Sequence, residues 1–343
     1  MRDFTLILPG SIDQLTGGYL YARRLVDGLG AAVALRELTG RFPDADATAC
    51  AASRAALAAL PDGACAVIDG LALAGFEECL ARQARRLRLV AFVHHPLAEE
   101  TGLSTAERQK FAALEMRLLP LFAGVICPSA RTADAVAAYG CMRTAIVPPG
   151  TFAGKKIDRS ARRPPWQLLT VATVTPRKGH EVLIAALGRL KAKDWRLTVI
   201  GSLERDTACV ARLRAAIAAH RLEERITLAG EWPPRRLGPA YEAADIFVLA
   251  SFHEGYGMVL AEALAYGLPI VSTRAGAIPD TVPESAGILV PPGDAAALAD
   301  ALTRVMEDNA LRARLAAGAA AVELPRWDAT VLRWAHAAEK FFA

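Results

Sequence analysis

The sequence has few aromatic residues and no long uninterrupted apolar run. Aromatic side chains make up 6% of the 343 residues, although hydrophobic residues together make up 53%. A composition dominated by alanine, leucine and valine is typical of helices packed on buried sheets, and it argues against a disordered or fibrous chain. No apolar run approaches the roughly 20 residues that span a bilayer, and the start MRDFTLILPGS lacks the layout of a signal peptide. We therefore expect neither a membrane-spanning nor a secreted protein.

Paired cysteines and a strong excess of one charge are also missing. The six cysteines form no Cys-x-x-Cys pair and no His/Cys spacing suited to zinc, so we expect a reducing, cytoplasmic location. The formal net charge of +4 is small for the length and argues against a nucleic-acid partner. The basic run RQARRLR at 82–88 is most typical of a solvated helix face. It is also compatible with weak peripheral contact with anionic lipid at the inner face of a membrane.

Short apolar runs alternate with helical patterns along the chain, which predicts buried parallel strands joined by helices. The first series has predicted strands at 4–8, 32–35, 65–70, 87–93, 124–129 and 144–150. The second has predicted strands at 167–174, 196–202, 226–230, 245–251, 269–273 and 287–293, with helices at 180–191, 205–220, 235–243, 257–266 and 294–306. The stretch between the two series, 150–166, contains glycines, charges and a double proline and reads as a linker.

These patterns predict an α/β protein with two tandem Rossmann-like domains, each a doubly wound parallel sheet. We place the first domain at 1–155 and the second at 156–324, with an amphipathic helix at 325–343 that packs back on the first. Open sheets of this kind bind ligands beyond the carboxyl ends of their strands. We therefore expect the two sheets to face a central cleft.

The stretch SFHEGYGMVLAEALAYGLPIVSTRAGAIPD, residues 251–280, carries two acids around a glycine-rich turn. Glu254 lies in the loop after a predicted strand, and Glu262 lies about one turn into the next helix. The start of that helix offers unpaired backbone N–H groups and a positive dipole end, which favour a phosphate, while Gly255 and Gly257 allow close approach. Carboxylates accept hydrogen bonds from sugar hydroxyls. The pattern predicts a site for a diphosphate with a sugar on each side, as in a nucleotide-sugar.

A basic pair supports this interpretation. Arg177 and Lys178 follow the first strand of the second domain, in the stretch VATVTPRKGHEVLIAAL at 171–187. Sheet topology places them at the same edge as Glu254, where cations can neutralise a diphosphate. An exposed turn is the structural alternative for this pair.

These motifs resemble retaining GT-B glycosyltransferases of family 4 (glycosyltransferase group 1). The resemblance covers roughly 165–325 well and the first domain more loosely. It is carried by VATVTPRKGHEVLIAAL, LTVIGS, GILVPPGDAAALADAL and the long stretch ITLAGEWPPRRLGPAYEAADIFVLASFHEGYGMVLAEALAYGLPIVSTRAGAIPD. Ala172 departs from the pattern, because the family more often has glycine there.

The resemblance implies a role for each matching residue of the second domain. Glu254 would meet the hydroxyls of the donor sugar, and Glu262 would meet the nucleotide ribose. The diphosphate would be held by Arg177, Lys178 and the turn of Gly255, Tyr256, Gly257 and Met258, the last two through their amides. Glu231 and Trp232 would flank the base.

The resemblance also implies site residues in the first domain. The stretch VHHPLAEETGL at 93–103 would place His94 beside the sugar, with His95 as the second candidate. TGGYL at 16–20, with Gly17 and Gly18, would approach the donor phosphate and the acceptor. A histidine at a strand end or a tight turn can equally be purely structural.

We expect a retaining hexosyltransferase that moves a sugar from a UDP- or GDP-linked donor to an acceptor hydroxyl by front-face attack, without a cofactor or metal. The Asp-x-Asp at 44–46 follows RFP instead of an apolar strand, so we do not expect it to bind a metal. A nucleotide-sugar epimerase or hydrolase of the same fold stays open, as does a non-catalytic nucleotide-sugar-binding scaffold. The acceptor is also left open between lipid, polysaccharide and small metabolite.

Overall fold

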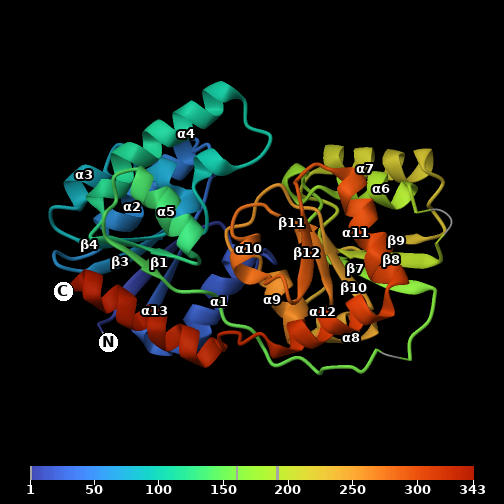
Figure 1. Cartoon of the computed structure of the whole chain (residues 1–343). Coiled ribbons are helices and arrows are strands. Elements are labelled where there is room, and N and C mark those ends of the chain that lie inside the picture. The colour runs from blue at the N-terminus through green and yellow to red at the C-terminus, as the bar shows by residue number, and fades with distance from the viewer. Residues whose placement is uncertain (1, 160, 191–192) are drawn as a thin grey trace. The chain divides into compact units, whose positions relative to one another are not determined.

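The computed structural model describes residues 2–159, 161–190 and 193–343, and the chain divides into two compact units. One unit comprises 1–150 with 325–343, and the other comprises 151–324. Each unit holds a six-stranded sheet whose neighbouring strands are all parallel (Figure 1). The predicted α/β architecture of two parallel sheets is confirmed. Residue 160 of the predicted linker and residue 191 at the end of the predicted helix 180–191 lie outside the described residues.

The first unit has the strand order β2-β1-β3-β4-β5-β6. Its strands are β1 (Phe4–Pro9), β2 (Val33–Leu38), β3 (Cys65–Asp69), β4 (Arg88–Phe92), β5 (Gly124–Cys127) and β6 (Thr144–Ile146). Its helices are α1 (Gly17–Leu29), α2 (Ala47–Ala58), α3 (Leu80–Gln83), α4 (Thr105–Leu118), α5 (Ala130–Ala138) and α13 (Trp327–Phe342).

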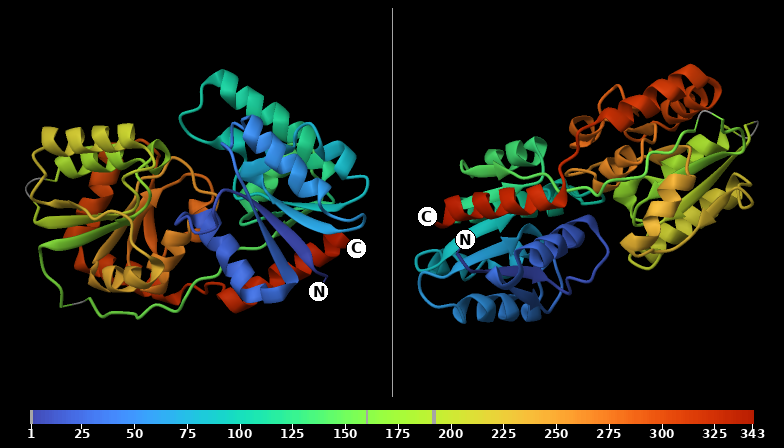
Figure 2. Two further views of the ribbon diagram at one scale, coloured as in Figure 1. Left: turned by 180° about the vertical axis from the view of Figure 1, so that it is seen from behind. Right: turned by 90° about the horizontal axis from the view of Figure 1, so that it is seen from below.

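Successive residues of a strand point to opposite faces of the sheet. Both faces of this sheet carry apolar side chains, and helices cover both. Ile7 and Ala91 face the core formed with α2, α4 and α5. On the other face, Phe4 of β1 and Phe92 of β4 contact Trp334 of α13, and Phe92 also contacts Tyr21 of α1. Figure 2 shows α1 and α13 side by side on this second face.

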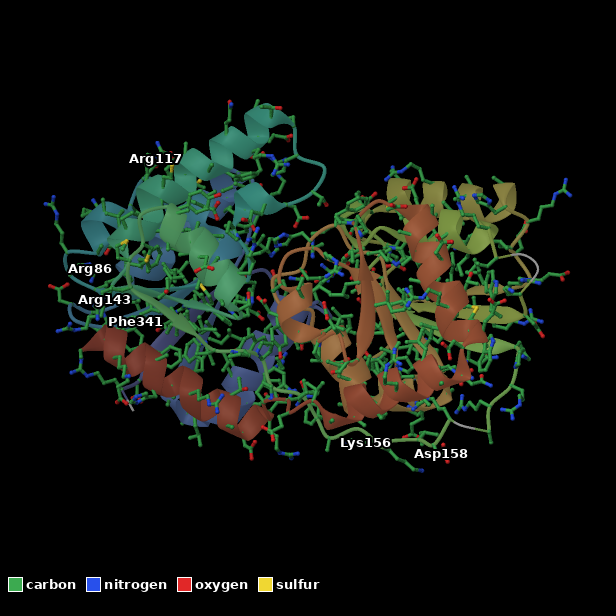
Figure 3. The ribbon with its side chains drawn as sticks, in the orientation of Figure 1. Arg86, Arg117, Arg143, Lys156, Asp158 and Phe341 are labelled. Atoms are coloured by element: carbon green, nitrogen blue, oxygen red, sulfur yellow. The ribbon has the colours of Figure 1, made fainter. Side chains whose placement is uncertain are left out.

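The C-terminal helix α13 is thus an integral part of the first unit. Trp334 is fully buried, and its ring centroid lies 5.4 Å from that of Phe4 and 5.8 Å from that of Phe92. Near the end of the helix, the guanidinium of Arg143 lies 5.4 Å from the ring centroid of Phe341 (Figure 3). The chain therefore returns to its first unit after completing the second.

The second unit has the strand order β12-β11-β10-β7-β8-β9. Its strands are β7 (Trp166–Val171), β8 (Trp195–Ile200), β9 (Ile226–Leu228), β10 (Ile246–Leu249), β11 (Ile270–Thr273) and β12 (Gly287–Val290). Its helices are α6 (His180–Gly188), α7 (Thr207–Ala219), α8 (Leu237–Ala243), α9 (Met258–Ala265), α10 (Ile278–Thr281), α11 (Ala295–Glu307) and α12 (Asn309–Ala321), with a short 3-10 turn at Pro176–Lys178 before α6.

Two cores sandwich this sheet. Leu168 and Val248 point to the side covered by α6, α7 and α11. Leu169 and Phe247 point to the side covered by α8, α9 and α10. Because β10 lies between β7 and β11, the loops after β7 and β10 emerge next to each other at the carboxyl edge.

The structure places the boundary between the units after Gly150, whereas the sequence pattern placed it after residue 155. Residues 151–159 belong to the second unit. Two of their side chains form hydrogen bonds with it. Lys156 donates to the Ala320 carbonyl oxygen at 2.5 Å, and the buried Arg159 donates to the carbonyl oxygens of Tyr241 and Ala244. Figure 3 labels Lys156 on this segment.

Two helices of the second unit were not predicted. The short helix α10 contains Pro279 near its start, and α12 is so rich in alanine that its sequence NALRARLAAGAAA shows no clear apolar stripe. Both form because tertiary packing buries residues such as Ile278 and Leu315.

Replacing Trp334 by Ala should lower the free energy of unfolding of the first unit by about 3–5 kcal/mol, because it leaves a cavity between α13 and the sheet. Denaturant unfolding followed by circular dichroism measures this change. Leu332→Ala provides the control, since Leu332 lies in the same helix but is 71% exposed. Equal effects of the two substitutions would show that α13 is not packed as described.

Candidate active site at the carboxyl edge of the second sheet

The loops after β7 and β10 are joined directly to each other. The backbone N–H of Phe252 donates to the carbonyl oxygen of Arg177 at 2.8 Å, and the Arg177 guanidinium donates to the carbonyl oxygen of His253 at 3.0 Å. These bonds hold the basic loop against the acidic one. The structure thus brings Glu254 together with the adjacent residues Arg177 and Lys178, although 76 positions separate Lys178 from Glu254.

Glu254 is the centre of this cluster. Its side chain is 7% exposed, and its Oε1 accepts from the Lys178 ammonium at 2.6 Å and from the Ser251 hydroxyl at 2.7 Å. The Arg177 guanidinium lies 3.5 Å from Oε2. Burial by itself raises the pKa of Glu254, but the charges of Lys178 and Arg177, with the hydrogen bonds from Lys178 and Ser251, lower it to about 2. Glu254 is therefore ionised at neutral pH.

Within this cluster, the two cations Arg177 and Lys178 outnumber the single carboxylate of Glu254. The cluster adjoins the start of α9, where Gly257 has a φ of 87° and caps the helix without a side chain. The turn is fixed from behind, because Ala277 N–H donates to the Glu254 carbonyl oxygen and the Thr281 hydroxyl to that of Tyr256. The edge therefore presents helix N-terminal amides beside guanidinium and ammonium groups, an arrangement that suits a phosphate-bearing ligand.

Each predicted residue of this turn has a definite place. Gly255, Tyr256 and Gly257 form the link between Glu254 and α9, and Met258 is the first residue of the helix. The phenol of Tyr256 is partly buried, and burial raises its pKa to about 12. The phenol of Tyr256 therefore stays neutral at neutral pH and can still form hydrogen bonds.

Glu262 lies in the fifth position of α9 and accepts a hydrogen bond from a neighbouring helix. The hydroxyl of Tyr241 in α8 donates to its Oε2 at 2.7 Å. Trp232 packs against the core on the side of the sheet covered by α8, α9 and α10, and its indole N–H donates to the Ala229 carbonyl oxygen at 3.1 Å. Its neighbour Glu231 is exposed in the loop after β9. Sequence reasoning missed Tyr241, because it lies 21 positions before Glu262 and in a different helix.

His180, the first residue of α6, is a further buried polar group beside the cluster. Burial lowers its pKa to about 4, and the nearby charge of Lys178 acts in the same direction. Among the described residues no hydrogen-bond partner is found for either ring nitrogen of His180. The neutral imidazole therefore adds no positive charge beside Lys178.

His94 occupies the corresponding strand end in the first unit. It lies just after β4, and its Nε2 lies 3.2 Å from Oδ2 of the buried Asp69 at the end of β3. An imidazole with its proton on Nε2 donates a hydrogen bond to a carboxylate in this position. The Phe92 ring lies 4.3 Å from the His94 ring. Sequence analysis missed Asp69, although its position at the end of a buried strand beside β4 was the available signal.

The glycine-rich loop of the first unit lies against His94. Gly17 is the first residue of α1, and a Cβ added to Gly18 would lie 3.0 Å from Cδ2 of the His94 ring. A side chain at Gly18 would therefore displace the imidazole. His95 points elsewhere, since its Nε2 lies 3.2 Å from Oε2 of Glu100.

A buried acid anchors the loop that carries both histidines. Glu115 of α4 is 1% exposed, and its carboxylate accepts from the backbone N–H groups of Leu97 at 2.7 Å and Ala98 at 3.2 Å. Burial raises the pKa of Glu115 to about 7, although the two N–H donors act in the opposite direction. Glu115 therefore titrates near neutrality.

The remaining candidates from the sequence have structural partners. In the Asp-x-Asp stretch, Asp44 binds Lys110, and Asp46 caps α2 by accepting from Ala49 N–H. In the basic run, Arg86 donates to the carbonyl oxygens of Leu57 and Leu60 (Figure 3). Within the described ranges, no group of three or more His, Cys, Asp or Glu side chains is placed to hold a metal ion. Within those ranges no helix combines the length and apolar character needed to cross a membrane.

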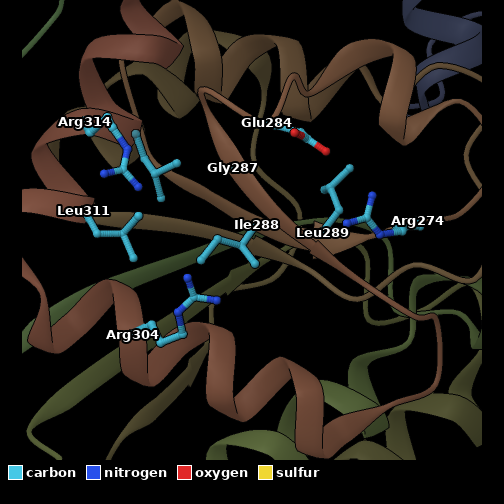
Figure 4. Close-up of a pocket in the computed structure, with 9 residues that line it drawn as sticks. Arg274, Glu284, Gly287, Ile288, Leu289, Arg304, Leu311 and Arg314 are labelled. Carbon is cyan, nitrogen blue, oxygen red and sulfur yellow. The ribbon is translucent and has the colours of Figure 1, made fainter.

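A cavity of about 200 Å³ lies beside the edge strand β12 of the second unit (Figure 4). Arg274, Arg304 and Arg314 line it together with Leu311 and other apolar side chains. Its lining includes none of the residues that the sequence predicted for the site.

Solved structures establish the fold class. Sucrose-phosphate synthase from Thermosynechococcus elongatus is 22% identical, with a TM-score of 0.82 over 100% of this chain and 99% of that chain. HepE from Anabaena, solved in complex with UDP and glucose, is 18% identical, with a TM-score of 0.76 over 98% of this chain and 99% of that chain. At these identities the likeness shows the fold alone, which is GT-B.

Sequence comparison gives the family of the second unit. Residues 155–322 match the model of glycosyl transferases group 1, so this part of the chain belongs to that family. D-inositol 3-phosphate glycosyltransferase from Corynebacterium efficiens is 34% identical over 168 residues, which cover 47% of this chain and 39% of that protein. The amylovoran biosynthesis glycosyltransferase AmsK from Erwinia amylovora is 36% identical over 161 residues, covering 44% and 39%. The matches thus span less than half the length of these relatives.

The raised pKa of Glu115 predicts a pH dependence of stability. The folded state holds the proton up to a pKa of about 7, against a reference value of 4.5, so this group makes the first unit less stable as the pH rises through that interval. Glu115→Gln should flatten the change in denaturation midpoint between about pH 5 and pH 8. The exposed Glu107→Gln is the control, and identical pH profiles for wild type and Glu115→Gln would contradict the assignment.

Proposed function

We propose that the chain is a retaining glycosyltransferase that moves a sugar from a UDP- or GDP-linked donor to an acceptor hydroxyl. The observation that carries this proposal is the buried Glu254, held by Lys178, Ser251 and Arg177 directly before the N-terminus of α9. Membership of the second unit in glycosyl transferases group 1 supports it. The UDP and glucose bound to HepE, which shares the fold, favour UDP as the first nucleotide to test.

The positive charge is the basis for binding the donor. A diphosphate placed at the start of α9 would meet backbone N–H groups and the Arg177 and Lys178 cations. These cations also stabilise the charge that develops on the departing diphosphate. Since protein side chains supply the neutralising charge, the proposed reaction uses neither a metal ion nor another cofactor.

The two acids have different parts in this proposal. Glu254 accepts hydrogen bonds from hydroxyls of the transferred sugar, because its low pKa keeps it an acceptor at any working pH. Glu262, further along α9, accepts from the hydroxyls of the ribose. The exposed Glu231 and the neighbouring Trp232 flank the base.

The proposed chemistry needs no covalent intermediate with the protein. The bond between the anomeric carbon and the diphosphate oxygen breaks as the acceptor oxygen bonds to the same face of that carbon. The proton of the acceptor passes to the departing phosphate oxygen. The chain then contributes positioning and charge stabilisation, which supply large parts of many enzymatic rate enhancements.

The first unit has three residues in the proposal. His94, beside Asp69, contacts the sugar. Gly17 and Gly18 at the start of α1 approach the donor phosphate and the acceptor, and Gly18 leaves room for the His94 ring. The acceptor is a lipid, a growing polysaccharide or a small metabolite. A membrane contact of the basic run 82–88 would use its exposed arginines Arg82, Arg85 and Arg88.

Two other functions are compatible with a nucleotide-sugar site. An epimerase would interconvert donors without releasing nucleotide, and a scaffold would bind donors without turnover. Transfer is distinguished by rapid nucleoside diphosphate release that depends on an acceptor. A panel of UDP- and GDP-sugars with candidate acceptors, assayed for release, separates the three.

Lys178→Ala should reduce the rate of nucleoside diphosphate release by about 10²-fold or more, because it removes a cation that stabilises the leaving group. It also leaves Glu254 buried without its nearest partner, so the assay is run well below the melting temperature of the variant. The control is Lys193→Ala, which removes an ion pair with Glu307 at a more exposed position and should keep the wild-type rate. Wild-type turnover by folded Lys178→Ala would remove Lys178 from the mechanism.

A further inference from the structure

Tyr241 holds one oxygen of Glu262 from the neighbouring helix. It lies in α8, is 1% exposed, and its hydroxyl donates to Glu262 Oε2 at 2.7 Å. Burial raises the pKa of Tyr241 well above its usual value, and the charge and hydrogen bond of Glu262 add to the effect. The phenol is therefore a permanent donor, and a carboxylate that accepts this bond can accept others as well.

The ring of Tyr241 has little freedom to move. It stacks on Tyr266 with ring centroids 5.2 Å apart and an interplanar angle of 16°, and it lies 6.0 Å from the ring of Phe247 in β10. An aromatic side chain packed in this way keeps its hydroxyl in one place. The direction of the bond to Glu262 is therefore set by the core of the second unit.

A buried arginine fixes the backbone that carries these rings. Arg159 is 8% exposed and donates to the carbonyl oxygens of Tyr241 at 3.0 Å, Ala244 at 2.7 Å and Tyr266 at 3.1 Å. Ala244 and Tyr266 are the C-terminal caps of α8 and α9. Arg159 thus binds the ends of both helices, where unpaired carbonyls and the negative dipole end favour a cation.

We propose that Tyr241 is a positioning residue that aims the Glu262 carboxylate at the ribose of the donor, with Arg159 holding α8 and α9 together. The hydrogen bond from Tyr241 fixes the rotation of the carboxylate before the nucleotide arrives. Binding then does not have to order a flexible glutamate side chain. This inference rests on the proposed function, because it assigns the ribose to Glu262.

The test measures binding of UDP and 2′-deoxy-UDP, or the guanosine pair if the donor panel selects GDP, by titration calorimetry. Tyr241→Phe should weaken binding of the ribonucleotide about tenfold, the effect of losing one hydrogen bond to a charged group. The 2′-deoxy nucleotide should lose less, so discrimination between the two sugars should shrink. In turnover, the change should fall mainly on the KM for the donor.

Tyr266→Phe is the matched control. It removes the same atom from the ring stacked on Tyr241 and leaves the hydrogen bond between Tyr241 and Glu262 in place. Its binding of both nucleotides should equal that of wild type. Arg159→Lys keeps a cation at the helix ends but has fewer hydrogen-bond donors. Like Tyr241→Phe, it should reduce the difference in affinity between the ribonucleotide and the 2′-deoxy nucleotide.

Three outcomes would overturn the inference. Wild-type discrimination by Tyr241→Phe would show that Tyr241 does not aim Glu262, while leaving the proposed function intact. An equal loss for both nucleotides, with a lowered melting temperature, would show that Tyr241 only supports the fold. Failure of the wild-type protein to bind either nucleotide would overturn the proposed function itself and this inference with it.

Discussion

The loops at the carboxyl edge of the second sheet are held together around a single buried carboxylate. Glu254 accepts from Lys178 and Ser251 and lies beside Arg177, so one side chain joins the loop after β7 to the loop after β10. The bond between Phe252 and the Arg177 carbonyl oxygen closes the same connection through the backbone. Both loops and the start of α9 therefore share one fixed geometry.

A buried ion pair contributes little net stability to a fold, because the free energy of desolvating both charges offsets much of their attraction. The arrangement makes better sense as a preorganised site. The surrounding cations lower the pKa of Glu254 to about 2, so the acid stays charged, and the two cations of this cluster outnumber its one acid. Preorganised charge of this kind costs no rearrangement when a reaction moves charge onto a leaving group. Tyr241 and Arg159 give Glu262 a comparable fixed support.

Sequence reasoning could predict the neighbourhoods that sheet topology dictates. Loops after adjacent parallel strands share an edge, which is why the proximity of Lys178 and Glu254 could be predicted although 76 positions separate them. It could not predict that the two side chains bind each other, or that Tyr241 reaches Glu262, since these contacts depend on how helices pack. The helix α12 was missed for a related reason, because its alanine-rich sequence carries no periodic signal and packing alone specifies its place.

The proposed function requires that the carboxyl edge of the second sheet, at Arg177, Lys178 and the start of α9, binds a diphosphate. Calorimetric comparison of a nucleoside diphosphate with the corresponding nucleoside, uridine or guanosine, tests it most directly. The account predicts that the diphosphate binds at least about 100-fold more tightly, because the cations and helix amides contact only the phosphates. Equal affinity for the two compounds, or no binding of either, would contradict it.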